Sequence, residues 1–218
     1  MSESGGLDFI LDNAPMQDGS EWKNKRIGAF TSSKMKVLVG KARSKDVVFS
    51  DGAMTYIYQK VWERMTGHEC SNFDGNAATE WGTQYEDEAI REFERVTGLK
   101  VQTAPYISKS LTYGGSPDGF VVGEDATVEV KCPYAPENFI RAVDGVIKPE
   151  YIIQDQSNMN VTGKSKCYHI TYDPRMPEGK RMVYKILERD EEMISLINER
   201  LVLADAEADR IIKILEDA

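Results

Sequence analysis

Residues 114–133 of the chain read GGSPDGFVVGEDATVEVKCP. The stretch contains two short apolar-rich runs, 119–122 and 127–131, and a Gly-Glu-Asp turn at 123–125 separates them. The second run alternates apolar and polar side chains, which is the period of a β-strand and not of a helix. We therefore expect a β-hairpin here, and the rest of the fold is predicted around it.

Charged side chains gather on one face of this hairpin. Val128 and Val130 alternate with Glu129 and Lys131, so the carboxylate and the ammonium share a face. Asp118 lies just before the first strand, and the hairpin can return it to the side of Glu129. Two hard oxygen ligands suit Mg²⁺ or Mn²⁺, and a lysine beside the metal could orient or deprotonate a water. The order P-D, spacer, E-x-K is that of the PD-(D/E)XK nucleases; the alternative is a solvated hairpin, and the spacing alone does not decide between them.

Composition places the chain among ordinary globular proteins. Its 218 residues are 41% hydrophobic and 29% charged, with no apolar run of transmembrane length and no signal-peptide pattern. The three cysteines form no C-x-x-C pair, so we expect a cytoplasmic protein without a disulfide framework, a zinc site or a membrane partner. The two histidines, His68 and His169, are expected to be surface or partly packed side chains. A hydrolase built from this chain must therefore rely on carboxylates and lysine.

The net charge of −9 opposes a nucleic-acid partner, because phosphate binding needs a basic footprint. Basic residues nevertheless crowd the first quarter of the chain, and the segment from Glu188 onward is mostly acidic. Local fields matter more than totals, so this asymmetry permits a basic face on an acidic protein without proving one.

Helical and strand patterns alternate along the chain after a loose lead-in at residues 1–19. We expect helices over Glu21–Arg26, Thr31–Val39, Ala77–Thr97, Pro136–Val143, 149–163 and Asp190–Leu215, and one that Asp51 caps and Gly67 closes. Besides the hairpin, we expect strands over Leu99–Ile107, Cys167–Tyr172 and Met182–Leu187. This order predicts one α/β or α+β domain over residues 1–218, a mixed central β-sheet flanked by helices, with 190–218 as a C-terminal helix.

Three helices carry patterns that bear on the core or on a site. The helix after Asp51 is expected to bury an apolar stripe made of Met54, Ile57, Tyr58, Val61, Trp62 and Met65. Hydroxyls at 31–33 favour simple N-capping, and an anion site beside Arg26 is the alternative. Glu86 lies one position from the buried stripe of its helix, where an acid is either solvated or directed into a site.

With these residues in view, the chain resembles the phage lambda exonuclease family, the YqaJ-type viral recombinase nucleases of the PD-(D/E)XK superfamily. The resemblance runs from about Trp22 to Asp190, and residues 70–76 and the later tail show no aligned match. Several motifs in the right order are far more specific than E-x-K alone, and they favour the metal nuclease. The matching motifs are Arg26-Ile-Gly, Thr31-Ser-Ser33, Ala42-Arg43-Ser44, Trp81-Gly-Thr-Gln-Tyr-Glu86, Ser116-Pro-Asp118-Gly, Glu129-Val-Lys131-Cys-Pro, Gln154-x-Gln156, Tyr172-Asp-Pro-Arg-Met176 and Glu188-Arg-Asp190.

The resemblance implies a role for each matching side chain. Asp118 and Glu129 would hold two Mg²⁺ ions, or Mn²⁺ in their place, with the Val130 carbonyl as a further ligand and Glu86 near the second metal. Lys131 would position or activate the attacking water, assisted by Gln154. The side chains implied to bind DNA are Arg26, Ser33 and Ser116 around a 5′-phosphate and Arg43 near the DNA entrance.

The resemblance also implies the activity and the partners. It predicts a Mg²⁺-dependent 5′→3′ exonuclease that degrades the 5′-ended strand of linear double-stranded DNA and leaves 3′ overhangs for phage-type recombination. The family forms a homotrimer ring around the duplex and works beside a single-strand annealing recombinase protein. Two other hypotheses remain: a restriction-type endonuclease on the same core, and a non-catalytic DNA-end-binding module. The intact Asp118, Glu129 and Lys131 disfavour the second of these.

Overall fold

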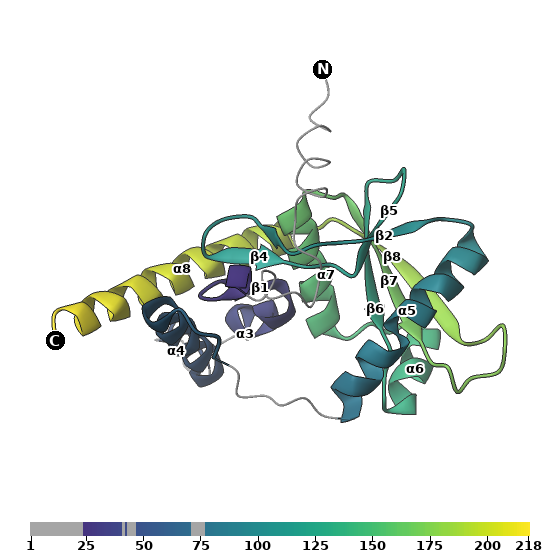
Figure 1. The fold of residues 1–218 in the computed structure, drawn as a ribbon, viewed down its shortest axis with the longest axis horizontal. Helices are drawn as coiled ribbons and strands as arrows, with labels where there is room; N and C mark the ends of the chain where they lie inside the picture. The colour runs from purple at the N-terminus through teal and green to yellow at the C-terminus, as the bar shows by residue number, and fades with distance from the viewer. Residues whose placement is uncertain (1–23, 41, 43–46, 71–76) are drawn as a thin grey trace, which may run out of the picture.

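A five-stranded mixed sheet forms one side of the molecule in the computed structural model, which describes residues 24–40, 42, 47–70 and 77–218 (Figure 1). Its strand order is β2-β5-β6-β7-β8, in which β6 and β7 run parallel and the other neighbours antiparallel. The expected mixed sheet flanked by helices is therefore confirmed. The strands are β2 (Val101–Thr103), β5 (Gly119–Val121), β6 (Ala126–Lys131), β7 (Lys166–Tyr172) and β8 (Met182–Glu188).

The predicted hairpin is the β5–β6 pair at the centre of this sheet. Gly119 lies opposite Val128, and the Asp118 N–H donates to the carbonyl of Val128 at 3.0 Å. Val128 packs in a buried cluster that includes Phe93 of α5 (Ala77–Thr97). Glu129, on the opposite face, is only 2% exposed. A solvated hairpin, the alternative that the spacing left open, is therefore excluded.

A second, smaller sheet has the order β1-β4-β3, made of β1 (Phe30–Thr31), β4 (Tyr113–Gly115) and β3 (Ile107–Ser108). The prediction of one strand over Leu99–Ile107 was wrong, because β2 and β3 belong to different sheets. Pro105 lies between them and has no N–H to give to a ladder. The break lets the chain leave the large sheet and form the small one.

Helices cover both faces of the large sheet. α5 packs on one face, and α7 (Pro149–Thr162) reaches Glu129 on the other. α6 (Pro136–Val143) follows the end of β6 and has the predicted bounds. The remaining helices, α3 (Met35–Val39) after a 3-10 turn at Ser32–Lys34, α4 (Asp51–Thr66) and α8 (Glu191–Glu216), form a second core with the small sheet (Figure 1). Within the described parts of the chain, no helix is both long and apolar enough to cross a membrane.

The buried face of α4 differs from the predicted stripe. Ile57 and Val61 are buried as expected, but Tyr58, Trp62 and Met65 are each about half exposed, between 47% and 53%. The helix is rotated because it buries a polar pair, Lys60 and Glu63, whose Nζ and Oε2 lie 2.7 Å apart. The Glu63 carboxylate also accepts the Gly28 N–H at 2.7 Å. The cap residue is Ser50 and not Asp51, since the Ser50 hydroxyl accepts the Ala53 N–H at 3.2 Å.

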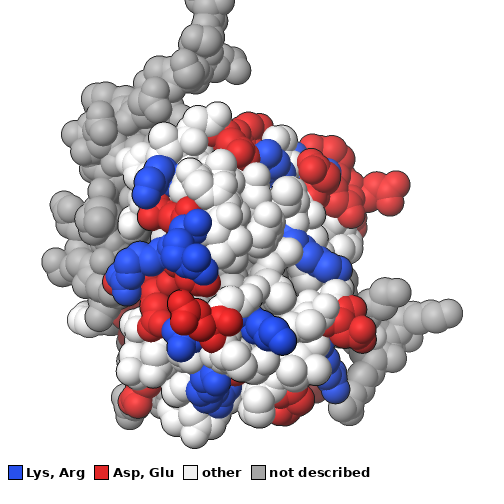
Figure 2. All heavy atoms as spheres, turned by 90° about the vertical axis from the view of Figure 1, so that its right-hand side faces the viewer, with Lys and Arg blue, Asp and Glu red and all other residues white. Residues whose placement is uncertain are grey.

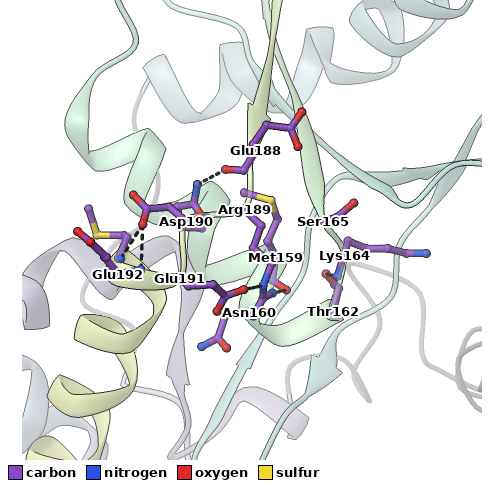
Figure 3. A network of polar contacts seen from close by, with 12 residues as sticks. Met159, Asn160, Thr162, Lys164, Ser165, Glu188, Arg189, Asp190, Glu191 and Glu192 are labelled. Carbon is purple, nitrogen blue, oxygen red and sulfur yellow. Dashed lines mark hydrogen bonds and ion pairs between the residues drawn. The ribbon is translucent and has the colours of Figure 1, made fainter.

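The junction between β8 and α8 holds the far end of α7. Asp190 caps α8 by accepting the N–H groups of Glu192 and Met193, each at 3.0 Å (Figure 3). Arg189 donates to the Met159 carbonyl near the C-terminus of α7 at 2.7 Å. Gln156 bridges the same junction, giving its amide to the Glu188 carbonyl and accepting the Asp190 N–H, both at 2.8 Å. These contacts fix α7, which carries Gln154, against the sheet.

Candidate active site

Three side chains, one from β6 and two from α7, donate hydrogen bonds to the buried carboxylate of Glu129. The Lys131 ammonium lies 2.6 Å from Glu129 Oε1, and the Gln154 amide also donates to that oxygen. Lys131 donates in addition to Gln154 Oε1 at 3.2 Å. Asn158 donates to the other oxygen, Glu129 Oε2, at 2.9 Å. Alternation along the strand grouped Glu129 with Lys131, and the family resemblance added Gln154. Asn158 was missed, although it follows Gln154 by four residues and so shares its helix face.

Asp118 is held beside the same strand. Its Oδ2 accepts the Val130 N–H at 2.6 Å, which fixes the carboxylate at the end of the hairpin. Burial first, and then the nearby charges of Glu129 and Glu86, raise the pKa of Asp118 well above its usual range. Glu86 lines the same cleft as Asp118 and Glu129, so of the two alternatives that its helix pattern left open, the structure favours an acid that faces the site. Three carboxylates thus share one small region.

The charges of Glu129 and Lys131 depend on each other. Burial raises the pKa of Glu129, and the neighbouring Lys131 ammonium opposes that rise. Burial alone would lower the pKa of Lys131, but the carboxylates of Glu129 and Asp118 outweigh it and raise this pKa above its ordinary value. Lys131 is therefore held as an ammonium. One cation among three acids leaves an excess of negative charge, which a bound divalent cation would offset.

A cleft of about 560 Å³ opens on this cluster. Its floor includes Asp118, Glu129, Val130 and Lys131, and Glu86 projects from the α5 wall. Among the described residues, no group of three His, Cys, Asp or Glu side chains is arranged so that it could hold a metal ion by itself. The oxygen donors nevertheless fit Mg²⁺ or Mn²⁺, because such ions are commonly held by one or two carboxylates with waters and substrate phosphate completing the shell. The residues present therefore fit an open site that the substrate would complete.

The three residues that the resemblance assigns to a 5′-phosphate pocket, Arg26, Ser33 and Ser116, lie next to strands of the small sheet. Arg26 is partly buried near Tyr106 and Tyr56, and burial lowers its pKa despite the nearby phenols. Ser33 Oγ lies 3.5 Å from Thr31 Oγ1, and the Ser116 hydroxyl donates to the Pro105 carbonyl at 3.3 Å.

The segments that carry Ser33 and Ser116 lie close together because they follow β1 and β4, which pair in parallel. A Cβ added at Gly115 would overlap the side chains of Ser32 and Asn158, so any larger residue there would have to displace them. The Thr31 side chain makes no capping hydrogen bond within the described part of the chain, and the expectation of simple N-capping was wrong. Arg43, the residues 1–19 and most of the loop 70–76 lie outside the described residues.

Comparison with known proteins identifies the family of the chain. Residues 21–165 match the model of the YqaJ-like viral recombinase domain. The chain belongs to the YqaJ family. The uncharacterized protein YqaJ of Bacillus subtilis (strain 168) is 30% identical over 141 residues, 63% of this chain. The match covers 43% of that relative, which is less than half of its length.

Solved structures place this YqaJ-family fold among exonuclease structures. An alkaline exonuclease from Laribacter hongkongensis, LHK-Exo, superposes with a TM-score of 0.81 at 29% identity, covering 91% of this chain and 97% of that one. That enzyme has also been solved in complex with dAMP. A phage-related exonuclease from Haemophilus somnus 129PT shares the fold with a TM-score of 0.72 at 19% identity, over 86% of this chain and 96% of that one. The expected family resemblance and fold are both confirmed.

The prediction for His169, which lies next to the candidate site, was wrong. It was expected at the surface or partly packed, yet it is 3% exposed. It lies opposite Glu129 in the β6–β7 register, with Nδ1 2.8 Å from Asp155 Oδ2. Its ring also stacks on Tyr151 at 5.9 Å between centroids. This buried pair supports the floor of the cleft beneath Glu129, and no pattern local to the histidine indicated it.

Proposed function

We propose that this YqaJ-family protein is a metal-dependent deoxyribonuclease, a 5′→3′ exonuclease that degrades the 5′-ended strand of linear double-stranded DNA. The proposal rests on one observation: Asp118, Glu129, Lys131 and Gln154 meet at the floor of a single cleft with Glu86 on its wall. The family membership supports a nuclease. The LHK-Exo structure, an alkaline exonuclease with the same fold at 29% identity, supports an exonuclease.

The metal would be held by Asp118, Glu129, the Val130 carbonyl and Glu86. Two bound Mg²⁺ ions would stabilise the charge that develops on the attacking and leaving oxygens of the phosphodiester. Lys131 donates to Glu129 and to Gln154, and in this proposal it would position or activate the attacking water. Gln154 donates to Glu129 and accepts from Lys131, and it thereby keeps the two charged groups in a fixed arrangement.

The 5′-phosphate pocket is part of the same proposal. Arg26 would pair with the phosphate, and the hydroxyls of Ser33 and Ser116 would donate to it. Ser116 precedes Asp118 by two residues, so a phosphate bound there would set how far the terminal nucleotide enters the cleft. The resemblance is the support for assigning these three side chains to the pocket and Arg43 to the DNA entrance.

The assembly and partners are proposed on the resemblance alone. We propose that residues 1–218 act as one nuclease domain, that three copies form a ring around duplex DNA, and that a single-strand annealing recombinase protein receives the 3′ overhang. The proposed compartment is the cytoplasm of a bacterial or phage-infected cell, where the 3 cysteines would remain reduced.

The test compares an end-labelled linear duplex with a covalently closed circle, in Mg²⁺ and in EDTA. We expect Mg²⁺-dependent release of mononucleotides from the 5′-ended strands and an intact circle. Lys131→Ala should abolish release, whereas Lys213→Ala on the exposed side of α8 should not. Discrete cuts in the circle would support an endonuclease instead. Tight binding to ends without turnover in Mg²⁺ or Mn²⁺ would support a non-catalytic binding module.

A further inference from the structure

The segment Tyr172–Met176, which reads YDPRM at the end of β7 and in the turn that follows, has no part in the cleft described above. Arg175 leaves this turn and covers the ring of Trp81 on α5, with its guanidinium carbon 4.7 Å from the ring centroid. The same guanidinium donates to the carbonyls of Pro133 and Tyr134 at 3.2 and 3.0 Å. One side chain therefore links α5 to the segment that directly follows Lys131.

Asp173 holds this guanidinium in a single orientation. Its two oxygens accept from Arg175 Nε at 2.8 Å and from Nη2 at 2.6 Å. Asp173 is 2% exposed, so the pair is anchored on its acidic side. A planar guanidinium can stack on an aromatic ring and donate in its own plane at the same time, which the ammonium of a lysine cannot do.

The N-terminal half of α5 contains no fully buried residue, so its position depends on side-chain contacts such as that between Arg175 and Trp81. The structure describes α5 in full, and its buried residues, Ala89 and Phe93, both lie in the C-terminal half. Trp81 in the N-terminal half is only partly buried; it packs against the margin of that core cluster and against Tyr85 and Tyr134, at 4.5 and 5.8 Å between ring centroids. The helix end that lines the cleft therefore packs only at the margin of the core, through Trp81 and Tyr85, and Arg175 adds a contact to Trp81 from outside it.

A second residue of the same segment holds α5 on the other side of Glu86. The Tyr172 hydroxyl donates to Glu88 Oε1 at 2.5 Å. Trp81 precedes Glu86 by five residues and Glu88 follows it by two, so the two contacts bracket the acid along the helix. With about 1.5 Å of rise per residue, the bracketed length is roughly 10 Å. A helix held at both points has little freedom to move Glu86.

We propose that Arg175, together with Tyr172, is a positioning residue that sets Glu86 relative to Glu129 and Lys131. The proposal rests on the proposed function, in which Glu86 supplies a carboxylate at the metal site. Arg175 touches no reacting atom; it is anchored on Asp173 and on the carbonyls after β6, and it acts on Glu86 through α5. Because a displacement of about 1 Å can lower a rate about a hundredfold, this linkage matters for turnover.

The test compares Arg175→Lys, Tyr172→Phe and a matched control, Arg95→Lys. Arg95 makes the same two-pronged pairing, with Glu92, on the exposed end of α5. We expect Arg175→Lys to lower kcat about tenfold or more, with KM for DNA ends within about twofold, since Glu86 alone is displaced. Mn²⁺ binding to the DNA-free protein, followed by electron paramagnetic resonance, should weaken severalfold. Tyr172→Phe should lower kcat and Mn²⁺ affinity in the same way but by less, with KM again unchanged. Arg95→Lys should match wild type in all three quantities.

A double-variant cycle separates positioning from general weakening. If Arg175 acts through Glu86, Arg175→Lys should lower kcat no further in a Glu86→Gln background. Losses that multiply, or an Arg175→Lys protein with wild-type kcat and Mn²⁺ affinity, would overturn the inference while leaving the nuclease proposal intact. If thermal unfolding shows that Arg175→Lys is not folded, the same cycle is carried out with Tyr172→Phe and Glu86→Gln, and its result decides. A wild type without metal-dependent hydrolysis would overturn both proposals.

Discussion

Asp118 shows at the scale of one residue why a candidate active site opposes stability. Burial and the charges of Glu129 and Glu86 raise its pKa, so the folded protein binds the Asp118 proton more tightly than the unfolded chain does. The stability that this proton contributes is present below the unfolded pKa of about 3.9 and is lost as the pH rises through the folded value. Above the unfolded pKa, the carboxyl group of Asp118 therefore makes the fold less stable than an uncharged side chain of the same shape would.

Asp118→Asn should remove this penalty. In EDTA at pH 8 we expect the variant to be more stable than wild type by at least about 1 kcal/mol, and the gain should shrink as the pH falls toward 4. The same variant should lose hydrolysis and the stabilisation that Mg²⁺ gives wild type. Urea unfolding across pH, with and without Mg²⁺, measures each quantity. Asp144→Asn, an exposed acid at the end of α6, should change none of them, and a destabilised Asp118→Asn in EDTA would contradict the argument.

At the scale of the elements, local sequence rules correctly predicted the helices and strands that begin and end at a proline, a glycine or a turn in their own sequence. The bounds of α5, α6 and α7 follow from Pro136, Pro149 and the glycines after the helices, such as Gly163 with its φ of 75°. The β5–β6 hairpin was predicted for the same reason. Its catalytic candidates could be grouped because alternation along a strand fixes which side chains share a face.

Local sequence rules could not predict which residues far apart in the chain come into contact. The period of α4 is satisfied by more than one apolar stripe, and tertiary contacts with Gly28 selected the face that carries Lys60 and Glu63. Asn158 and His169 were missed in the candidate site because their relation to Glu129 exists only once α7 and β7 lie beside β6. The structural link from Arg175 to Trp81 likewise joins residues 94 positions apart in the sequence.

The rotation of α4 can be tested by a pair of substitutions. Trp62 would be a core residue in the predicted stripe, and a buried Trp→Ala change costs about 3–5 kcal/mol. Because Trp62 is 47% exposed, we expect Trp62→Ala to cost less than about 1.5 kcal/mol. Glu63→Ala should cost about 3–5 kcal/mol, since it leaves the buried Lys60 without its partner. Urea unfolding of the two variants decides, and the reverse order would contradict the structure.

At the scale of the whole molecule, a chain with a net charge of −9 would have to bind DNA, as proposed, through local groups. The face shown in Figure 2 mixes basic and acidic side chains with large uncharged areas and presents no broad basic field. Nonspecific attraction to phosphates is therefore weak on that face, and recognition of an end has to depend on particular contacts such as the proposed 5′-phosphate pocket.

Arg26 provides the test of that pocket. Charge-assisted hydrogen bonds contribute about 1.5–3 kcal/mol each, so wild type should degrade a 5′-phosphorylated duplex about ten- to a hundredfold faster than a 5′-hydroxyl duplex at limiting substrate. Arg26→Ala should lose this preference by slowing only on the phosphorylated end. Lys36→Ala changes the net charge equally but removes a half-exposed cation whose nearest acid is Glu150 at 3.9 Å, so it should keep the preference. Equal slowing of both substrates by Arg26→Ala would show that Arg26 attracts DNA generally and does not bind the terminal phosphate.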